Sequence, residues 1–301
     1  MESNLAQLSN ELENAIERAA PYVVGVHGRG HVSSSGFLFR EGVVVTAQHA
    51  LRREEDIRVT LPSGETVDAT LAGGDGASDI AVLRIESKTP PLSAGRASNL
   101  RPGQIVLSLG RSRDSGINAS MGILSAVSGE WRPWRGGRLE SYLRLDLRLF
   151  PASAGGPVLT PAGELVGMAT PVLSRIAPLA VPHAAIHRIA GDLLSKGRVA
   201  RGYLGVGLQP VPLPDHLKQS LGHEGGSAVI VLSVETGSPA EKGGVVIGDV
   251  LLSIDGHSLR SVEDLHGALD SRLIGKTVKV KLARAGQPKT IEITVSERGA
   301  Q

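Results

Sequence analysis

The sequence has 301 residues, of which 41% are hydrophobic and only 3% aromatic, and its formal net charge is +2. This length is more than one small core usually needs and predicts two domains, while the absence of cysteine excludes disulfides, thiolate catalysis and cysteine-bound zinc. Basic residues are spread along the chain, and even the densest stretch, 132–138, is typical of a glycine-containing loop, so we expect no nucleic-acid partner.

The sequence shows no sign of membrane insertion or export. It contains no run of about 18 apolar residues, so we expect no membrane span. Its N-terminus lacks the basic start and apolar stretch of a secretory signal. As written, the chain is expected in the cytoplasm, or in the periplasm or another extracytoplasmic compartment if an export segment has been removed.

The first residues have a helical pattern, and a long series of short strands follows. Apolar residues from Leu5 to Ile16 recur every three or four positions, and Pro21 ends this helix. Beyond it, short apolar segments alternate with turns such as 62–64 and 73–76, which predicts an all-β domain. The expected strands are 22–26, 36–39, 43–47, 57–61, 67–71, 80–85, 105–109, 123–127, 142–147, 157–159 and 165–169.

A helix over 183–196 and a basic connection over 197–202 separate this domain from a smaller one. The smaller unit mixes strands and helices. Its strands are expected near 204–208, 228–234, 250–254, 278–284 and 290–295, and its helices near 240–242 and 262–273. The chain is therefore predicted to be mostly β, with a helical segment over 1–20, a β domain over 21–197 and a second domain over 202–297.

Three features carry candidate chemistry, and each taken alone has a structural explanation. His49 follows an apolar strand in the segment 46–50 (TAQHA), and Asp79 opens the buried strand 79–85. The segment 151–157 (PASAGGP) has two glycines that allow a tight turn with backbone N–H groups facing a carbonyl oxygen. Their order is that of chymotrypsin, in which His is the general base and Asp orients its ring.

These three blocks resemble the HtrA (Deg) family of serine proteases. The segments 165–170 (LVGMAT), 179–182 (LAVP) and 201–206 (RGYLGV) are similar to further segments of that family, so the resemblance covers about residues 5–297. It implies a chymotrypsin-like double β-barrel followed by a PDZ domain, which is a β-rich α+β fold. It also implies that His49 is the base and Asp79 its orienting partner.

The turn departs from the family pattern at two positions. The family usually has Pro-Gly-x-Ser-Gly-Gly-Pro, so Ala154 falls on the nucleophile position and Ala152 on a glycine. A methyl group cannot attack a carbonyl, and the adjacent Ser153 is expected to point elsewhere, so we expect no turnover by this chain. The resemblance also implies an oxyanion hole built from the N–H groups of Ala152, Ser153 and Ala154. Two explanations of Ala154 are open: a deliberate Ser→Ala change, or a natural pseudoprotease.

The resemblance further implies an apolar substrate pocket for medium aliphatic side chains. Its expected walls are Leu149, Ala169, Thr170 and Pro171, within the stretches before and after the turn. Arg148, six residues before the nucleophile position, would select acidic side chains if it faced this pocket. The alternation of leucines at 145, 147 and 149 instead favours an Arg148 side chain that points away.

The C-terminal domain is expected to bind the free carboxylate of a peptide. By resemblance, Tyr203, Leu204, Gly205 and Val206 form the carboxylate-binding loop, which holds the carboxylate with backbone N–H groups. A helix from 261, with Leu265 and Leu269 one turn apart, is expected to line the groove. The alternative is a packing module without peptide affinity.

Taken with the resemblance, the sequence leads to two hypotheses about function. The first is an ATP-independent serine endopeptidase of protein quality control that cleaves unfolded proteins, binds peptide C-termini and forms a homotrimer through residues near 1–25. The second is a natural pseudoprotease that acts as a peptide-binding or chaperone-like scaffold. Neither hypothesis requires a metal or other cofactor, and we expect none.

Overall fold

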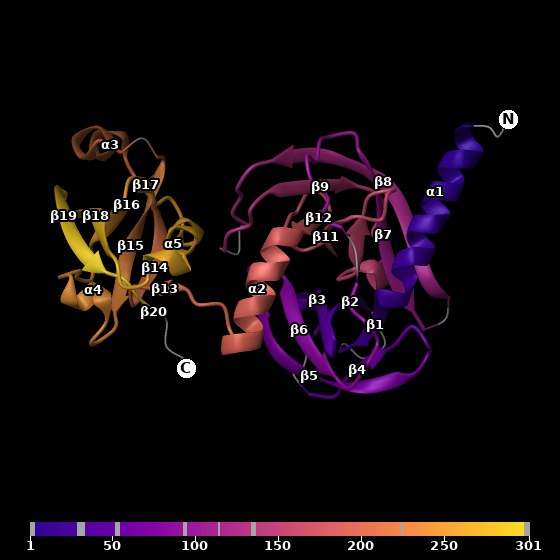
Figure 1. Cartoon of the computed structure of the whole chain (residues 1–301). Helices are drawn as coiled ribbons and strands as arrows, with labels where there is room; N and C mark the ends of the chain where they lie inside the picture. The colour runs from indigo at the N-terminus through magenta and orange to yellow at the C-terminus, as the bar shows by residue number, and fades with distance from the viewer. Residues whose placement is uncertain are drawn as a thin grey trace. The chain divides into compact units, whose positions relative to one another are not determined.

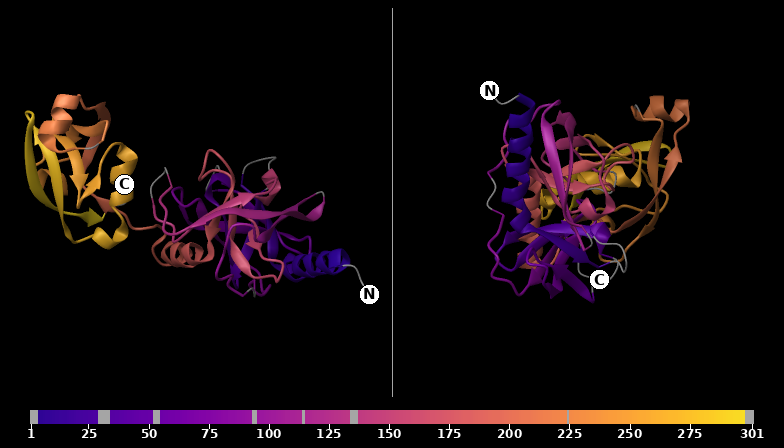
Figure 2. Two further views of the ribbon diagram at one scale, coloured as in Figure 1. Left: turned by 90° about the horizontal axis from the view of Figure 1, so that it is seen from above. Right: turned by 90° about the vertical axis from the view of Figure 1, so that its right-hand side faces the viewer.

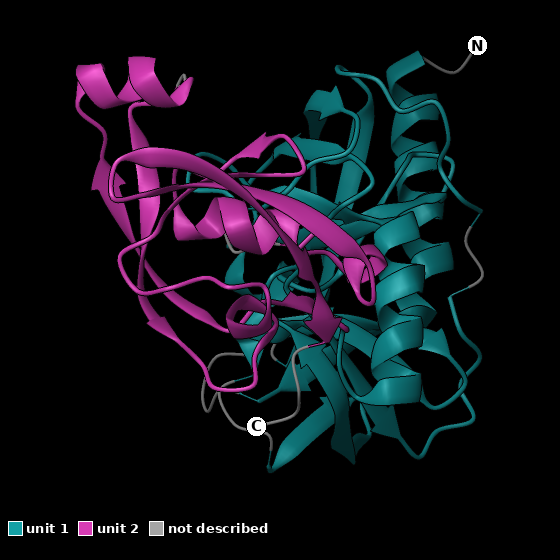
Figure 3. Ribbon diagram, turned by 90° about the vertical axis from the view of Figure 1, so that its left-hand side faces the viewer, with its two compact units in different colours: residues 1–134, 138–199 teal, residues 135–137, 200–301 magenta. Residues whose placement is uncertain are grey.

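The computed structural model describes residues 4–28, 34–51, 55–92, 95–113, 115–133, 137–223 and 225–297. The chain divides into two compact units, which Figure 3 shows in different colours. Unit 1 comprises Met1–Trp134 and Arg138–Val199, and unit 2 comprises Arg135–Gly137 and Ala200–Gln301. Unit 1 contains two closed six-stranded barrels and unit 2 a separate sheet, so the predicted double-barrel, mostly β architecture is confirmed. Trp134 and Arg135, in the basic stretch singled out above, lie outside the described residues.

Helix α1 (Asn4–Ala19) lies at the outer edge of unit 1 (Figure 2). Its apolar stripe is divided between two environments, because Leu12 and Ile16 pack against the core while Leu5 is 77% exposed. A 3₁₀ turn, Ala20–Tyr22 (η1), joins it to the first strand. The guanidinium of Arg111 donates to the carbonyl oxygens of Ala20 at 2.8 Å and Val23 at 2.6 Å, which fixes this junction to the second barrel.

The first barrel is closed in the order β1-β2-β3-β6-β5-β4 (Figure 1). Its strands are β1 (Val23–His27), β2 (Ser34–Arg40), β3 (Val43–Ala47), β4 (Ile57–Thr60), β5 (Thr66–Asp75) and β6 (Ile80–Ile85). The prediction of a turn over 73–76 was wrong at its start, because β5 continues to Asp75. A Cβ on Gly73 would lie 2.3 Å from the carbonyl oxygen of Gly197, so the glycine serves close packing here.

The second barrel is closed in the order β10-β11-β12-β9-β8-β7. Its strands are β7 (Ile105–Ser112), β8 (Gly116–Ser128), β9 (Tyr142–Asp146), β10 (Pro157–Leu159), β11 (Leu165–Thr170) and β12 (Leu179–Pro182). Strand β8 starts seven residues before the predicted strand over 123–127. Helix α2 (His183–Lys196) has the predicted bounds, and Gly197 ends it in a left-handed conformation with φ of 70°.

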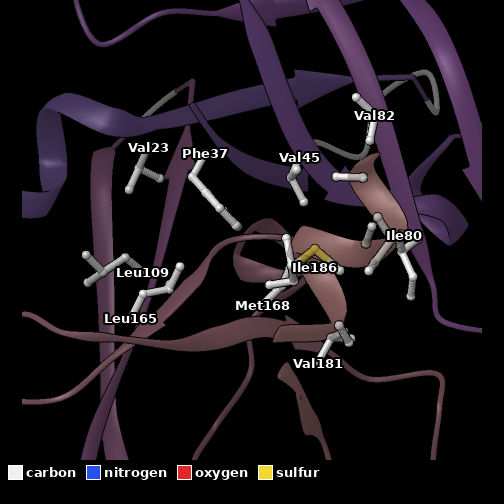
Figure 4. Close-up of a cluster of buried hydrophobic side chains, with 14 of the residues drawn as sticks. Val23, Phe37, Val45, Ile80, Val82, Leu109, Leu165, Met168, Val181 and Ile186 are labelled. Carbon is white, nitrogen blue, oxygen red and sulfur yellow. The ribbon is translucent and has the colours of Figure 1, made fainter. Parts of the chain in front are cut away.

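One hydrophobic cluster joins both barrels and helix α2 (Figure 4). Phe37 of β2 and Ile80 of β6 come from the first barrel, and Met168 of β11 comes from the second. Ile186 of α2 belongs to the same cluster, and all four side chains are at most 1% exposed. Because the strands that lead into the candidate catalytic residues share this core, the ends of these strands are held in a fixed relation.

Unit 2 contains a sheet in the order β14-β15-β16-β18-β19, with β14 at one edge. The strands of unit 2 are β13 (Gly202–Tyr203), β14 (Val206–Pro212), β15 (Ser227–Val234), β16 (Val250–Ile254), β17 (His257–Ser258), β18 (Thr277–Arg284), β19 (Gln287–Thr294) and β20 (Ser296–Glu297). Of these, β13 and β20 pair with each other in a separate two-stranded sheet. Its helices are α3 (Asp215–Leu221), α4 (Pro239–Lys242), α5 (Val262–Ala268) and the 3₁₀ turn η4 (Ser271–Leu273). The sequence did not predict α3, and the helix expected over 262–273 is two elements rather than one.

In the part of the chain that the structure describes, no helix is both long and apolar enough to cross a membrane.

Candidate functional site

His49 and Asp79 lie together because the strands that carry them are neighbours in the first barrel. His49 lies in the 3₁₀ turn Gln48–Ala50 (η2) directly after β3, and Asp79 directly precedes β6. These strands are antiparallel, with Ala47 opposite Ile80, so the end of one meets the start of the other. Nδ1 of His49 is 2.8 Å from Oδ2 of Asp79 and 3.0 Å from Oδ1.

The Asp79 carboxylate is buried and held by three donors. The residue is 1% exposed, and besides the imidazole it accepts the backbone N–H of His49 at 2.9 Å and the hydroxyl of Thr170 at 2.5 Å. An ionised carboxylate only accepts hydrogen bonds, so Nδ1 of His49 carries the hydrogen and Nε2 is left as an acceptor. The imidazole is therefore oriented to take a proton at Nε2.

Thr170 has a different position from the predicted one. The sequence analysis placed it in the wall of a substrate pocket, but it is fully buried and its hydroxyl donates to Asp79. It ends strand β11, so the second barrel supplies this hydrogen bond to a carboxylate of the first. Burial was predictable from the apolar run before Thr170, but the sequence gives no signal for the hydroxyl's partner.

Ala154 lies in a turn that hydrogen bonds attach to both barrels. Its carbonyl oxygen accepts the N–H of Ser35 from β2 at 2.9 Å, and the N–H of Gly155 donates to Ala169 of β11 at 2.8 Å. Gly155 has a φ of +83°, and a Cβ there would lie 2.3 Å from the carbonyl oxygen of Ser35. Glycine at 155 is thus required by both conformation and space.

Of the three backbone N–H groups expected to form an oxyanion hole, those of Ser153 and Ala154 are already used inside the turn. Residues Pro151–Ser153 form a 3₁₀ turn (η3), in which the N–H of Ser153 donates to Phe150 at 2.8 Å and that of Ala154 to the Pro151 carbonyl at 3.3 Å. In a trans peptide the carbonyl and the following N–H point in opposite directions, so the Ala152 N–H points away from Ala154.

Ser35 holds this turn from the other side. Its hydroxyl donates to the carbonyl oxygen of Ala152 and accepts the N–H of Arg111 at 2.7 Å. The predicted use of Ala152, Ser153 and Ala154 together as donors therefore requires a rearrangement of this turn.

His49 and Ala154 line one cavity of about 330 Å³. Most of its other walls are apolar. The remaining lining residues are Ser34, Ala50, Leu149, Phe150, Pro151, Pro171 and Val172. Of the predicted pocket residues, Leu149 and Pro171 are in this lining, whereas Ala169 and Thr170 are fully buried behind it. Phe150 was not predicted to line the cavity.

In unit 2, the loop between β13 and β14 presents backbone N–H groups at the open edge of the sheet. Val206 lies opposite Val234, and the N–H of Glu235 donates to the Gly205 carbonyl at 2.9 Å. This is the pattern of a non-hydrogen-bonded antiparallel pair, so the Val206 N–H points away from β15. Among the described residues, the N–H groups of Leu204 and Gly205 have no acceptor either.

The conformation of this loop depends on Gly205. Its φ is +80°, and a Cβ there would lie 2.3 Å from Cβ of Ser238. The carbonyl of Leu204 accepts the N–H of Ala240 at 2.8 Å, while the hydroxyl of Tyr203 donates to the Glu235 carboxylate. These bonds turn the loop's carbonyls inward, which is the arrangement that leaves its N–H groups available to an anion.

Both regions match known protein families. Residues 34–168 match the trypsin-like peptidase domain, and residues 202–295 match the PDZ domain. The chain is 30% identical over 268 residues to a probable periplasmic serine endoprotease DegP-like of Pseudomonas fluorescens, covering 87% of this chain and 55% of that protein. It is 29% identical to protease Do-like 1, chloroplastic, of Arabidopsis thaliana, covering 88% of this chain and 64% of the relative. The chain thus spans little more than half the length of the first of these relatives.

Solved structures agree over nearly the whole chain. A form of the HtrA-type protease AlgW with one serine replaced by alanine, solved with a decapeptide, superimposes with a TM-score of 0.75 at 26% identity and covers 96% of this chain and 98% of that one. The serine endoprotease from Yersinia pestis gives a TM-score of 0.70 at 28% identity, with the same coverage of both chains. The chain belongs to the HtrA-type serine proteases.

In the PDZ domain of this HtrA-type chain, two residues predicted to line the peptide groove are buried instead. Leu265 and Leu269 are 3% and 5% exposed and belong to the core of unit 2 instead of an open groove wall. Val206 and Leu208 of β14 and Val262 of α5 are only partly buried against this core. These three side chains are therefore the apolar surface that remains accessible beside the edge strand.

Arg148 is not among the residues that line the cavity shared by His49 and Ala154. Its side chain is exposed, and its guanidinium carbon lies 4.8 Å from the centre of the Phe150 ring. The backbone carbonyl of Arg148 accepts the hydroxyl of Ser120 at 2.7 Å. The strand alternation therefore predicted the direction of this side chain correctly, but not its contact with a cavity residue.

Among the described residues, no group of three or more His, Asp or Glu side chains is arranged to hold a metal ion. The site in unit 1 is composed of an imidazole, a carboxylate, a hydroxyl and a tight turn. This set suits acyl transfer by a serine nucleophile, provided that a serine stands at position 154.

Proposed function

We propose that the scaffold is that of an ATP-independent serine endopeptidase of protein quality control, which cleaves unfolded proteins and holds peptide C-termini in its PDZ unit. The observation that carries this proposal is the network of Thr170, Asp79 and His49, which faces a cavity shared with Ala154. In that network His49 is the general base, Asp79 orients it, and Thr170 fixes Asp79. With alanine at 154 the chain binds substrate without hydrolysing it.

The proposed assembly is a homotrimer formed through the N-terminal region. Its support is the apolar stripe of α1, which packs on the core at Leu12 and Ile16 but leaves Leu5 77% exposed. An exposed apolar helix end of this kind is a suitable surface for another copy of the chain. Sedimentation of the chain and of L5E tests this: a trimer that L5E dissociates supports the proposal, and a monomer in both cases contradicts it.

The test of the peptidase proposal is the A154S variant incubated with an unfolded protein such as casein. Because loss of a triad nucleophile costs about 10⁶-fold in kcat, we expect A154S to raise cleavage by at least about 10⁴-fold, even if the turn limits the rate. Adding H49A to A154S should remove this gain. Folded A154S without any cleavage would contradict the proposal.

A second function is supported by the state of the turn. In a natural pseudoprotease that serves as a peptide-binding scaffold, neither a nucleophile nor an open oxyanion hole is needed. Ala154, Ala152 and the bond from the Ala154 N–H to Pro151 all agree with that function. The two functions are distinguished by A154S/A152G, since the site of a natural pseudoprotease that no longer supports hydrolysis should stay inactive even with both residues replaced.

A further inference from the structure

Arg148 lies beside the cavity of unit 1, and its positive charge is not used in an ion pair with a described residue. Arg148 is exposed, and no ion pair joins it to any described carboxylate, including Asp146 two residues earlier. Its contact is with the ring of Phe150, at 4.8 Å from the ring centre. Such cation–π contacts leave the guanidinium N–H groups free for an anionic partner.

Phe150 connects this charge to the substrate-binding cavity. Phe150 is 41% exposed and also forms part of the cavity lining with Leu149 and Val172. A peptide that inserts an apolar side chain into the cavity therefore passes the ring that supports Arg148. An extended peptide rises about 3.3–3.6 Å per residue, so the guanidinium is within reach of side chains about one or two positions from the inserted residue.

No charge in the cavity lining opposes an acidic ligand. Among its lining residues, His49 is the only one with a titratable side chain, and its imidazole is directed to Asp79. Asp79 is 1% exposed and satisfied by its three donors, so its charge is enclosed. A carboxylate in the peptide would thus meet no carboxylate of the lining, while Arg148 is held against a lining residue, Phe150.

We propose that Arg148, supported by Phe150, selects peptide segments with an acidic residue within about two positions of the apolar residue that fills the cavity. This inference rests on the proposed function, because it specifies the substrate class of the same site. The expected gain is modest, since an exposed ion pair contributes about 0.2–1 kcal/mol, which corresponds to about a 1.4- to five-fold difference in Kd.

The test uses the full chain with Ala154, because a chain without a nucleophile allows binding to be measured without cleavage. The probes are fluorescent decapeptides with a central leucine flanked by two aspartates or by two asparagines. Their C-termini are amidated, so that the carboxylate-binding loop of the PDZ unit is not engaged. Fluorescence anisotropy gives Kd for each peptide at low salt and at about 0.5 M salt, where exposed ion pairs are screened.

We expect the aspartate peptide to bind about 1.4 to five times more tightly at low salt, with the preference reduced at high salt. R148Q should abolish the preference and R148E should reverse it. R101Q removes the same charge from an exposed residue outside the cavity lining and should leave the preference intact. L149W, which fills the cavity, should weaken both peptides together.

The outcomes separate this inference from the proposed function. If both peptides bind equally and R148E changes neither Kd, the Arg148 assignment is wrong while the cavity remains a peptide site. If neither peptide binds, or if L149W has no effect on binding, the proposed use of the cavity fails and the Arg148 assignment fails with it.

Discussion

Each unit has a short loop whose backbone N–H groups would bind a negatively charged oxygen, and the two loops are in opposite states. In unit 2, where Gly205 has a φ of +80°, the N–H groups of residues 204–206 have no acceptor among the described residues. In unit 1, the N–H groups of Ser153 and Ala154 are used inside the 3₁₀ turn Pro151–Ser153. A glycine at one position therefore decides whether such a loop is open.

The physical reason is the direction of a single peptide group. Opening the turn in unit 1 requires the Pro151–Ala152 peptide to rotate by about 180°, which takes φ of residue 152 from about −60° in a 3₁₀ turn to positive values. Glycine adopts positive φ without a steric cost, whereas alanine loses about 1–2 kcal/mol there. Ala152 therefore favours the closed turn, and its family counterpart glycine would not.

The largest expected effect is the loss of peptide binding when the open loop of unit 2 is closed by G205A. The added Cβ would lie 2.3 Å from Cβ of Ser238 and the residue would be strained at its φ of +80°. We expect peptides with a free C-terminal carboxylate to bind at least about ten-fold more weakly, since strain of about 1–2 kcal/mol adds to the clash. Titration with a free-acid peptide and its amidated form measures this.

G256A is the matched control for G205A. Gly256 has a φ of +82°, but a Cβ there meets no atom within 4 Å, so the backbone strain is the same and the clash is absent. It joins β16 to β17, away from the loop. If G256A weakened the free-acid peptide as much as G205A does, general destabilisation rather than loop closure would be the cause.

The next effect comes from opening the closed turn with A152G in the A154S background. Because glycine removes a penalty of about 1–2 kcal/mol, kcat/KM should rise about five- to thirty-fold over A154S alone. The rise should appear in kcat, since donors to the oxyanion act in the transition state. Steady-state kinetics on a peptide substrate measures it.

A separate change shows whether Ser35 contributes to the closed state. S35A removes the hydroxyl that donates to the Ala152 carbonyl. In A154S, we expect a smaller gain than with A152G, about two- to five-fold, because one hydrogen bond contributes about 1 kcal/mol and the Arg111 N–H loses its acceptor. If neither S35A nor A152G changed kcat, the turn would not limit the reaction.

The sequence predicted the contact between His49 and Asp79 better than the conformation of the turn. His49 and Asp79 were found because both are adjacent to apolar segments that pair as β3 and β6, and strand pairing fixes where their ends lie. The turn over 151–157 was recognised from its glycines, but the direction of the Pro151 carbonyl depends on the 3₁₀ hydrogen bond to Ala154. A peptide group's rotation leaves no trace in a hydrophobic pattern.

The hydrophobic pattern of the sequence also could not predict the partners of side chains or the close packing of the backbone. Thr170 was predicted in the wall of the pocket, but it is fully buried, and the partner of its hydroxyl, Asp79, is 91 residues away in sequence. Gly73 and Gly74 resemble a turn in sequence, yet both lie in β5, which continues to Asp75. At Gly73, the backbone of Gly197 approaches too closely for any Cβ. In both cases the deciding fact is a tertiary neighbour.

The smallest expected effect is a difference between the units in acid, which arises from their titratable groups. In unit 1, burial and then the charges of His187 and Arg96 lower the pKa of His183 from 6.5 to about 4. In unit 2, burial would raise the pKa of Asp249, but the hydrogen bonds from Arg284 and Val246 outweigh it and keep the pKa below its ordinary value of 3.8.

The sign of the effect follows from which state binds more protons. Between about pH 6.5 and 4 the unfolded chain protonates residue 183 while the folded unit 1 does not, so acidification destabilises unit 1. For Asp249 the loss begins only below its ordinary pKa of 3.8. Lowering the pH from about 7 to about 5 should therefore lower the Tm of unit 1 and leave unit 2 nearly unchanged.

Tryptophan fluorescence can follow unit 1 selectively, because both tryptophans of the chain, Trp131 and Trp134, belong to it. In H183Q, the Tm of unit 1 should fall less between about pH 7 and about pH 5 than in the unchanged chain. The difference should be a few degrees or less, because His183 is only partly buried and solvent screens its interactions. H257Q, which changes an exposed histidine of unit 2, is the control and should leave the decrease as it is. An equal acid sensitivity in H183Q and the unchanged chain would show that other groups, such as His27 with its lowered pKa, cause it.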